Sequence, residues 1–305
     1  MLPFRFGVYA AVAPTMSAWR DQARTAEGLG YSTLYISDHL DAQFGPLVAT
    51  TVAAEATSTL HIGPFVLNND FRHPVVLAKE IATLGLAAEG RVEVGLGAGS
   101  LRSDYDQAGI EFDELALRVD RLAESLAVMK RLWTEGEATS RGTYYTVRGA
   151  RCDPRPAVPP RVMVGGGSKR LLTLAAREAD TVGINTSLSV GDDRAGTVQA
   201  TLDRYDRCLT WIQEAAPDRF GSIELQIVAF ATRIVASRRA AARTATMLGL
   251  PGEDALELPI VLLGTVDEVC EQLLKRRERW NFTNIVVPAE VMESFAPVVA
   301  RLAGT

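Results

Sequence analysis

The sequence predicts an α/β protein of the (β/α)8 TIM-barrel class, and three observations lead to this fold class. Eight short apolar segments alternate along the chain with segments of helical periodicity. The strand segments are apolar on both faces, as a parallel sheet covered by helices requires. Polar or glycine-rich residues directly follow four strands, at the ends where such barrels carry their sites. An open, doubly wound sheet is the alternative reading of this alternation.

The elements are predicted from apolar runs for the strands and from apolar residues three or four apart for the helices. The predicted strands are residues 4–9, 33–37, 61–67, 91–96, 162–164, 181–184, 224–229 and 284–287. The predicted helices are residues 17–29, 47–56, 75–88, 112–133, 171–176, 197–215, 240–248, 266–280 and 294–302. Residues 137–160 form a hairpin around Arg141-Gly142 and a proline-rich linker, which we interpret as an insertion. One domain, residues 1–305, is therefore predicted.

Composition and charge exclude several classes of protein. The chain of 305 residues has a net charge of -5, which argues against a general nucleic-acid surface. No apolar run approaches the roughly 18 residues that a membrane span needs, and no signal-peptide pattern is visible, so we expect a cytoplasmic protein. Cys152, Cys208 and Cys270 are widely spaced. This spacing predicts neither a disulfide framework nor a structural zinc site.

The segment R-V-M-V-G-G-G-S-K-R, residues 161–170, predicts an anion-binding turn. Its glycines, Gly165, Gly166 and Gly167, allow a tight turn and a close approach of the backbone to a ligand, and Ser168 is placed to cap the next helix. The first turn of that helix carries unpaired N–H groups, to which Lys169 adds a full positive charge. We expect a phosphate to bind here. The alternative is a strand-to-helix turn whose glycines only avoid a clash.

Four strand ends carry the polar and flexible residues of the chain. They are Asp38 and His39 after the second strand, Asn68 and Asn69 after the third, residues 97–100 after the fourth and residues 165–169 after the fifth. In a barrel of parallel strands these ends all face one mouth, so we expect the four groups to form one cavity.

Several of these motifs together resemble the bacterial luciferase-like family. They are I-S-D-H-L at residues 36–40, F-R-H-P at 71–74, R-V-E-V-G-L-G-A-G at 91–99 and V-G-G-G at 164–167. The resemblance runs through the whole chain and is weakest between residues 186 and 259. It implies a luciferase-like TIM barrel that binds FMN or the deazaflavin coenzyme F420, acts on a small organic molecule and forms a homodimer. The S-D-H form is similar to the F420-dependent branch of the family.

The resemblance also implies roles for individual residues. Asp38 lies near the deazaflavin ring and His39, with Asp38, beside the reacting centre, while the Phe65-Val66 peptide is cis and bends the ring. Gly97 and Gly99 permit close approach of the backbone to the cofactor, and residues 165–169 hold its phosphate. The implied cofactor-binding residues are Asp38, Phe65, Val66, Asn68, Gly97, Gly99, Gly165, Gly166, Gly167, Ser168 and Lys169. Ser100 stands where the family's dehydrogenases carry a catalytic glutamate.

Several assignments stay open at this point. His39 is suited to moving a proton because its ordinary pKa is about 6.5, but it is alternatively a buried histidine bonded to a backbone carbonyl. Asp38 is alternatively a helix or loop cap. We interpret His61 as structural, and His73 as fixing its loop or alternatively as touching the cofactor tail. Arg72 and Arg102 either meet the anionic tail of F420 or form surface ion pairs.

Three functions remain compatible with the sequence. The first is an F420-dependent oxidoreductase that transfers a hydride between deazaflavin C5 and a small organic substrate. The second is an FMN-dependent monooxygenase that receives reduced flavin from a partner reductase. The third is a non-catalytic protein that binds a flavin or a deazaflavin. Residues 41–46 and 186–194 are predicted to shape the pocket.

Overall fold

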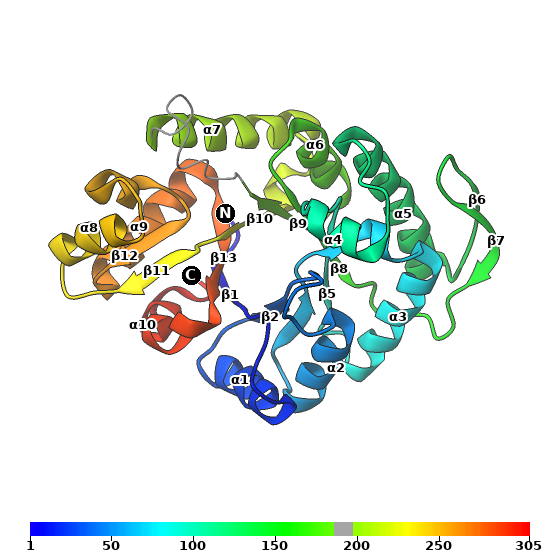
Figure 1. Ribbon diagram of the computed structural model, residues 1–305, viewed down its shortest axis with the longest axis horizontal. Helices are drawn as coiled ribbons and strands as arrows, with labels where there is room; N and C mark the ends of the chain where they lie inside the picture. The colour runs from blue at the N-terminus through cyan, green and yellow to red at the C-terminus, as the bar shows by residue number, and fades with distance from the viewer. Residues whose placement is uncertain (186–197) are drawn as a thin grey trace. The chain divides into compact units, whose positions relative to one another are not determined.

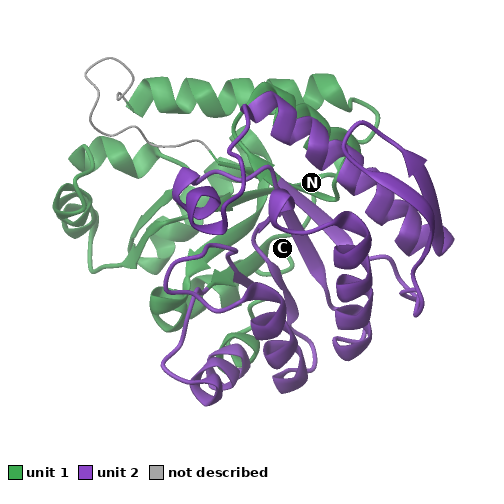
Figure 2. Cartoon of the chain, turned by 45° about the vertical axis from the view of Figure 1, so that its right-hand side comes forward, with its two compact units in different colours: residues 1–9, 25–33, 165–305 green, residues 10–24, 34–164 purple. Residues whose placement is uncertain are grey.

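The computed structural model describes residues 1–185 and 198–305. Their contacts divide the chain into two compact units, each assembled from discontinuous stretches (Figure 2). Unit 1 comprises residues 1–9, 25–33 and 165–305, and unit 2 comprises residues 10–24 and 34–164. The predicted pocket segment 186–194 and the predicted helix start at Thr197 lie outside the described residues.

Unit 1 is built on a parallel sheet with the strand order β1-β13-β10-β9 (Figure 1). The strands are β1 (Arg5–Tyr9), β13 (Phe282–Pro288), β10 (Glu224–Val228) and β9 (Thr181–Ile184). In the register of the first pair, Gly7 lies opposite Val286. The residues of β9 are all buried, and six of the seven in β13 are, so the prediction that these strands are covered on both faces is confirmed.

The helices of unit 1 begin at side-chain caps in three cases. They are α6 (Lys169–Glu178), α7 (Val198–Ala215), α8 (Arg238–Met247), α9 (Val266–Trp280) and α10 (Met292–Leu302). Ser168 caps α6 and Ser237 caps α8. At α9, Thr265 and Glu268 form a capping box in which each side chain accepts from the backbone N–H of the other residue.

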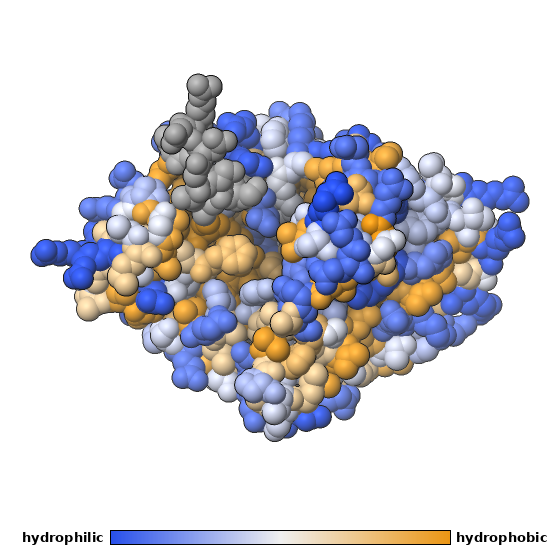
Figure 3. Space-filling model, in the orientation of Figure 1, coloured by the Kyte–Doolittle hydropathy of each residue, from blue (hydrophilic) through white to orange (hydrophobic). Residues whose placement is uncertain are grey.

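A second, two-stranded parallel sheet in unit 1 was not predicted. It pairs β11 (Ala231–Ile234) with β12 (Val261–Gly264). β11 lies between the predicted strand 224–229 and the predicted helix 240–248, and β12 lies between that helix and the predicted helix 266–280. The sequence predicts no element in either place. Figure 3 shows apolar side chains at the surface where the end of β10 and β11 lie. Phe230, between these two strands, is 57% exposed, so its apolar side chain is not covered by the described residues.

Unit 2 contains the remaining parallel strands. They are β2 (Thr33–Ile36), β3 (His61–Pro64), β4 (Leu67–Asn68), β5 (Glu93–Gly97) and β8 (Arg161–Gly166), of which β2 begins and β8 ends with residues of unit 1. β5 pairs with β4 and β8, and β2 neighbours β3. The single strand predicted at residues 61–67 is thus divided into β3 and β4 around Phe65 and Val66.

The helices of unit 2 follow the predicted ones closely, with one addition. They are α2 (Pro46–Ala56), α3 (Pro74–Ala87), α4 (Arg102–Ala108) and α5 (Leu115–Glu135), together with the first part of α1 (Met16–Gly28). The predicted hairpin is confirmed as β6 (Glu137–Arg141) and β7 (Thr146–Arg151). The additional helix, α4, follows the fourth predicted strand.

A buried ionic network lies at the starts of the strands of unit 1. Glu224, the first residue of β10, accepts hydrogen bonds from Arg5 at 3.1 Å, Thr181 at 3.0 Å and the amide of Asn284 at 2.9 Å. These three bonds reach Oε2, and Arg5 also donates to Oε1 at 3.3 Å, so each carboxylate oxygen has a donor and burial of the charge is tolerable. This end of the sheet is therefore filled by structural contacts.

Candidate functional site

Asp38 follows β2, and its carboxylate braces the loop that follows β4. Arg72 donates from both terminal nitrogens, with Nη2 at 3.0 Å from Oδ1 and Nη1 at 2.5 Å from Oδ2. The backbone N–H of Asn68 donates to Oδ2 at 2.9 Å. The Asp38 side chain is only 3% exposed. Its contacts agree with the alternative reading of Asp38 as a loop cap, and Arg72 has an ion pair within the protein.

His39 is paired with a carboxylate that the sequence did not indicate. Nδ1 of its ring lies 2.7 Å from Oδ2 of Asp104, a residue of α4. The other oxygen, Oδ1, accepts the backbone N–H of Leu40 at 3.3 Å. The side chain of His39 is 31% exposed, whereas that of Asp104 is 6% exposed. His39 is therefore neither fully buried nor held by a backbone carbonyl, and its second nitrogen, Nε2, is not the one that binds Asp104.

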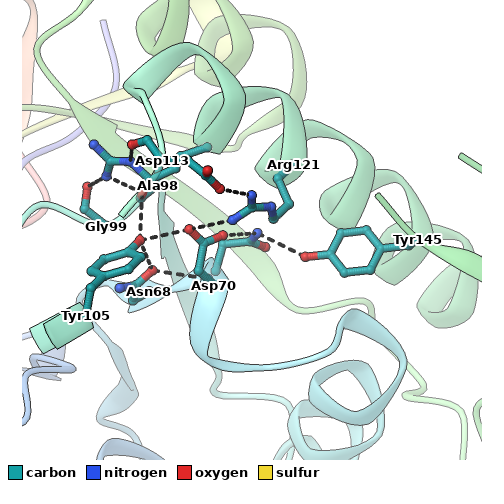
Figure 4. Close-up of polar contacts among 10 residues, drawn as sticks. Asn68, Asp70, Ala98, Gly99, Tyr105, Asp113, Arg121 and Tyr145 are labelled. Carbon is teal, nitrogen blue, oxygen red and sulfur yellow. Dashed lines mark hydrogen bonds and ion pairs between the residues drawn. The ribbon is translucent and has the colours of Figure 1, made fainter. Parts of the chain in front are cut away.

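A hydrogen-bond network surrounds Tyr105, the next residue of α4 (Figure 4). The buried hydroxyl of Tyr105 lies 2.9 Å from Oδ2 of Asp70 and 3.1 Å from Oδ1 of Asn68. Arg121 of α5 pairs with Asp70 at 3.0 Å and also with Asp113. Burial, followed by the hydrogen bond with Asp70, raises the pKa of Tyr105 to about 12.

This network fixes Asn68 in one orientation. Its Oδ1 accepts the backbone N–H of Asp70 at 3.1 Å and lies 3.1 Å from the Tyr105 hydroxyl oxygen. No acceptor for Nδ2 of Asn68 is found within the described part of the chain. The side chain thus keeps a hydrogen-bond donor for a ligand, as expected of a residue predicted to lie close to the cofactor.

The peptide bond between Phe65 and Val66 is cis, so this prediction is confirmed. Two glycines of β5 make room for it. A Cβ atom on Gly97 would lie 2.5 Å from Cγ2 of Val66, and one on Gly95 would lie 2.5 Å from the carbonyl oxygen of Pro64. The packing of Val66 therefore requires glycine at position 97, even without a ligand near its backbone.

Gly99 is required for two reasons. Its φ is +75°, a conformation that favours glycine, and a Cβ atom would collide with the hydroxyl of Tyr105. Arg118 of α5 donates to the carbonyl of Ala98 at 2.8 Å and also to that of Gly99. The turn after β5 is thus held by side chains from α4 and α5.

The glycine segment of unit 1 differs in part from the prediction. β8 continues through Gly165 and Gly166, so the strand ends two residues later than predicted. None of its three glycines, all described, has a positive φ. A Cβ atom on Gly166 would collide with the side chain of Leu171, and one on Gly167 with the carbonyl oxygen of Asn185. Gly166 therefore allows close packing of β8 against α6, and Gly167 allows close packing against the residue after β9, so both glycines avoid a clash, as the alternative reading supposed.

The start of α6 carries the cations expected of a phosphate site. Ser168 accepts the backbone N–H of Leu171 at 3.3 Å, so the predicted cap is confirmed. Lys169 is exposed. Nη2 of Arg204 on α7 lies 3.6 Å from the position that a Cβ atom of Gly167 would occupy. Arg204 was not predicted, because its place beside this turn depends on how α7 packs.

The other two histidines also have contacts within the protein. His73 caps α3 by accepting the backbone N–H of Val75 at 3.3 Å, in agreement with its reading as a loop-fixing residue, and His61 lies 3.4 Å from Glu93. All three cysteines are free and buried. No metal-binding cluster of His, Cys, Asp or Glu is found in residues 1–185 and 198–305. The helices of these two ranges are all too short or too polar to span a lipid bilayer.

The chain is similar to proteins of known sequence and structure. A family model described as luciferase-like monooxygenase matches residues 1–296. An F420-dependent glucose-6-phosphate dehydrogenase of Intrasporangium calvum is 34% identical over 170 residues, which cover 52% of this chain and 51% of the relative. The chain thus spans about half the length of this relative.

Two solved structures resemble the chain over 99% of its length. The F420-dependent tetrahydromethanopterin reductase from Methanopyrus kandleri has a TM-score of 0.78, with 18% identity and 98% of its chain covered. The EDTA monooxygenase from Chelativorans sp. BNC1 has a TM-score of 0.77, with 15% identity and 95% covered. At these identities the likeness shows the fold alone. The predicted luciferase-like (β/α)8 barrel is confirmed, and the open sheet is not adopted.

Proposed function

The chain belongs to the luciferase-like monooxygenase family, and from this premise we propose that it is an F420-dependent oxidoreductase acting on a small organic substrate. The observation that carries the proposal is the partly exposed imidazole of His39, one nitrogen of which is held by buried Asp104. Such a group is suited to moving one proton during a redox reaction. The choice of F420 follows the relative from Intrasporangium calvum, which is named as F420-dependent.

The donors at the start of α6 fit the phosphate of this cofactor. First-turn N–H groups and the helix dipole give partial positive charge, to which Lys169 and Arg204 add full charges. No carboxylate pairs with Lys169 or Arg204 among the described residues. We propose that these groups, with residues 165–168, bind the phosphate of the cofactor.

The residues after β2, β4 and β5 fit the ring of the cofactor. Asn68 keeps a free N–H donor, which suits the carbonyl oxygens on the edge of a flavin or deazaflavin ring. Bound F420 supplies a ring carbon that accepts or donates a hydride. The carboxylate of Asp38 is already bound by Arg72 and Asn68, so we assign it the task of orienting this loop and give the proton to His39.

Two other functions differ from this one in the cofactor that binds or in whether the bound cofactor is turned over. An FMN-dependent monooxygenase is favoured by the family's description and by the likeness to the EDTA monooxygenase. It requires FMN, oxygen and a partner reductase. A non-catalytic carrier is favoured by Ser100, which is exposed and offers no carboxylate. It would bind cofactor without turnover.

Replacement of His39 tests the proposal most simply. We expect His39→Ala to lower turnover of F420 with a small alcohol or its carbonyl product by about 100-fold, the usual contribution of a positioned proton-transfer group. The affinity for F420 should stay within about twofold, since His39 is not assigned to binding. His73→Ala is the matched control, because the contacts of His73 are the cap of α3 and the ring of Tyr145. Equal turnover in wild type and His39→Ala would remove His39 from the mechanism.

The assembly and location of the protein are also proposals. A homodimer is supported by the family resemblance, and a cytoplasmic location by three free, buried thiols. Light scattering of the purified protein at several concentrations tests the first. A monomer at every concentration would contradict it.

A further inference from the structure

We propose that Asp104 is the positioning residue of His39, holding the imidazole in the tautomer that carries its proton on Nδ1. This inference rests on the proposed function, in which His39 moves the proton. Its basis is the 2.7 Å contact between Nδ1 of His39 and Oδ2 of Asp104. A carboxylate accepts hydrogen bonds and does not donate when ionised, so the proton of a neutral imidazole lies on the nitrogen that faces it.

The carboxylate is fixed on its other side as well. Oδ1 of Asp104 accepts the backbone N–H of Leu40, the residue after His39. Asp104 thus binds the ring and the backbone of the same loop. With its side chain 6% exposed, it has little freedom to rotate away from His39.

The helix that carries Asp104 is itself anchored. Tyr105, the next residue, is fully buried and its hydroxyl contacts Asp70 and Asn68. The guanidinium of Arg118 lies 5.9 Å from the centre of the Tyr105 ring. These contacts keep the first turn of α4 in place, so the position of Asp104 does not depend on its bond to His39.

The two ring nitrogens of His39 therefore have different roles. With Nδ1–H donating to Asp104, Nε2 carries the lone pair and accepts a proton from a substrate hydroxyl. The resulting imidazolium keeps its positive charge beside the ionised carboxylate, and the proton returns from Nε2 in the reverse direction. A third group that orients the base in this way is a general device of proton-transfer sites.

The tautomer is measured directly by nitrogen NMR of protein labelled at its histidines, without any cofactor. The chain has only three histidines, and the signals of His39 are assigned by their loss in His39→Gln. We expect Nδ1 protonated and Nε2 unprotonated at a pH where the ring is neutral. Asp104→Asn should exchange the two signals, because an amide can donate to Nδ1.

Asp106→Asn is the matched control, since it removes the same charge from an exposed position two residues along α4. We expect it to leave the tautomer of His39 and the turnover unchanged. Asp104→Asn should lower kcat at least about tenfold while the affinity for F420 changes less than about twofold, as expected for lost proton transfer without lost binding. Comparable spectra and melting temperatures of the two variants show that Asp104→Asn is folded.

Two results would overturn the inference. One is a proton on Nε2 in the wild-type protein, which needs no variant to be seen. The other is an Asp104→Asn protein with the wild-type tautomer and wild-type kcat. If the wild type does not turn over F420 at all, the proposed function fails, while the NMR comparison still decides whether Asp104 sets the tautomer.

Discussion

Asp38 and Asp104 are both buried acidic residues near the end of β2, yet their partners give them different tasks. Asp38 faces a permanent cation, Arg72, and a backbone N–H, so its charge is neutralised and its position fixed. Asp104 faces His39, whose charge changes when it takes a proton. In the proposed function, Asp104 therefore stabilises the charge that His39 gains, whereas Asp38 holds its loop in place.

Tyr105 provides a test of the network in Figure 4. Its pKa of about 12 lies above the ordinary value of 10.0, so the folded state favours the neutral phenol. The stability that Tyr105 contributes is therefore complete below pH 10 and is lost as the pH rises through about 12. We expect Tyr105→Phe to be less stable than wild type at pH 8 by about 1 kcal/mol, the usual worth of a hydrogen bond.

This difference should narrow between pH 10 and pH 12, because only the wild type has a phenol there to ionise. Urea unfolding of both proteins at several alkaline pH values measures it. Tyr31 and Tyr145, whose pKa values burial also raises, are present in both proteins and cancel in the comparison. A difference that stays constant up to pH 12 would show that Tyr105 is not protected as described.

Sequence reasoning reached some site residues and missed others for a physical reason. Ser168 was predictable as a cap because its partner is three residues away. His39 and Asp104 are 65 residues apart, and Asp38 and Arg72 are 34 apart. No local period relates such pairs, since α4 and the loop after β4 bring them together. Residues that act on their neighbours in the chain are visible in sequence, and partners brought by folding are not.

At the scale of elements, α6 and α8 offer a natural comparison. Both are ten-residue helices capped by a serine, with Oγ to N distances of 3.3 Å, and both have two basic residues in the first turn. In α8, however, Arg238 pairs with Glu253 at 2.8 Å. At α6, by contrast, no carboxylate of the described residues pairs with Lys169, which we propose to bind the phosphate.

We expect Ser168→Ala and Ser237→Ala each to lower the free energy of unfolding by about 1 kcal/mol, the usual value of an N-cap. Only Ser168→Ala should also weaken F420 binding, by about threefold to tenfold, because it loosens the turn that we propose to bind the phosphate. Chemical denaturation and cofactor titration of both variants test this. Equal effects of the two substitutions on F420 affinity would argue against phosphate binding at α6.

The regular elements were largely predictable, and the irregular ones were not. The helix predicted at residues 266–280 has those same bounds as α9, because its apolar residues keep a helical period and Thr265 and Glu268 mark its start. The helix α4 escaped prediction because its seven residues include only two buried ones, Asp104 and Tyr105. Its position comes from hydrogen bonds of those side chains, which a hydrophobic pattern does not record.

At the scale of the molecule, the chain passes between its two units at residues 9, 24, 33 and 164. No single linker separates them, and β1 of unit 1 is encoded at the opposite end of the chain from its partner β13. Domains that fold alone are usually joined by one exposed linker. The prediction of one domain, residues 1–305, therefore implies a single cooperative unfolding transition.

The tryptophans allow this to be measured, since Trp19 and Trp133 belong to unit 2 and Trp211 and Trp280 to unit 1. We expect unfolding curves from tryptophan fluorescence and from circular dichroism to coincide. Replacing the tryptophans of either unit by phenylalanine should leave the midpoint common to both probes. Two separate midpoints, one for each unit, would show that the chain folds as two domains.

Equilibrium titration of the purified protein with F420, FMN and the deazaflavin that lacks the phosphate tests the proposed cofactor most directly. Quenching of cofactor fluorescence gives the three dissociation constants. We expect F420 to bind with one site per chain, at least about tenfold more tightly than either other compound, a difference of about 1.4 kcal/mol. Tighter binding of FMN, or equal binding of the deazaflavin with and without its phosphate, would contradict an F420-dependent enzyme that holds its cofactor by the phosphate.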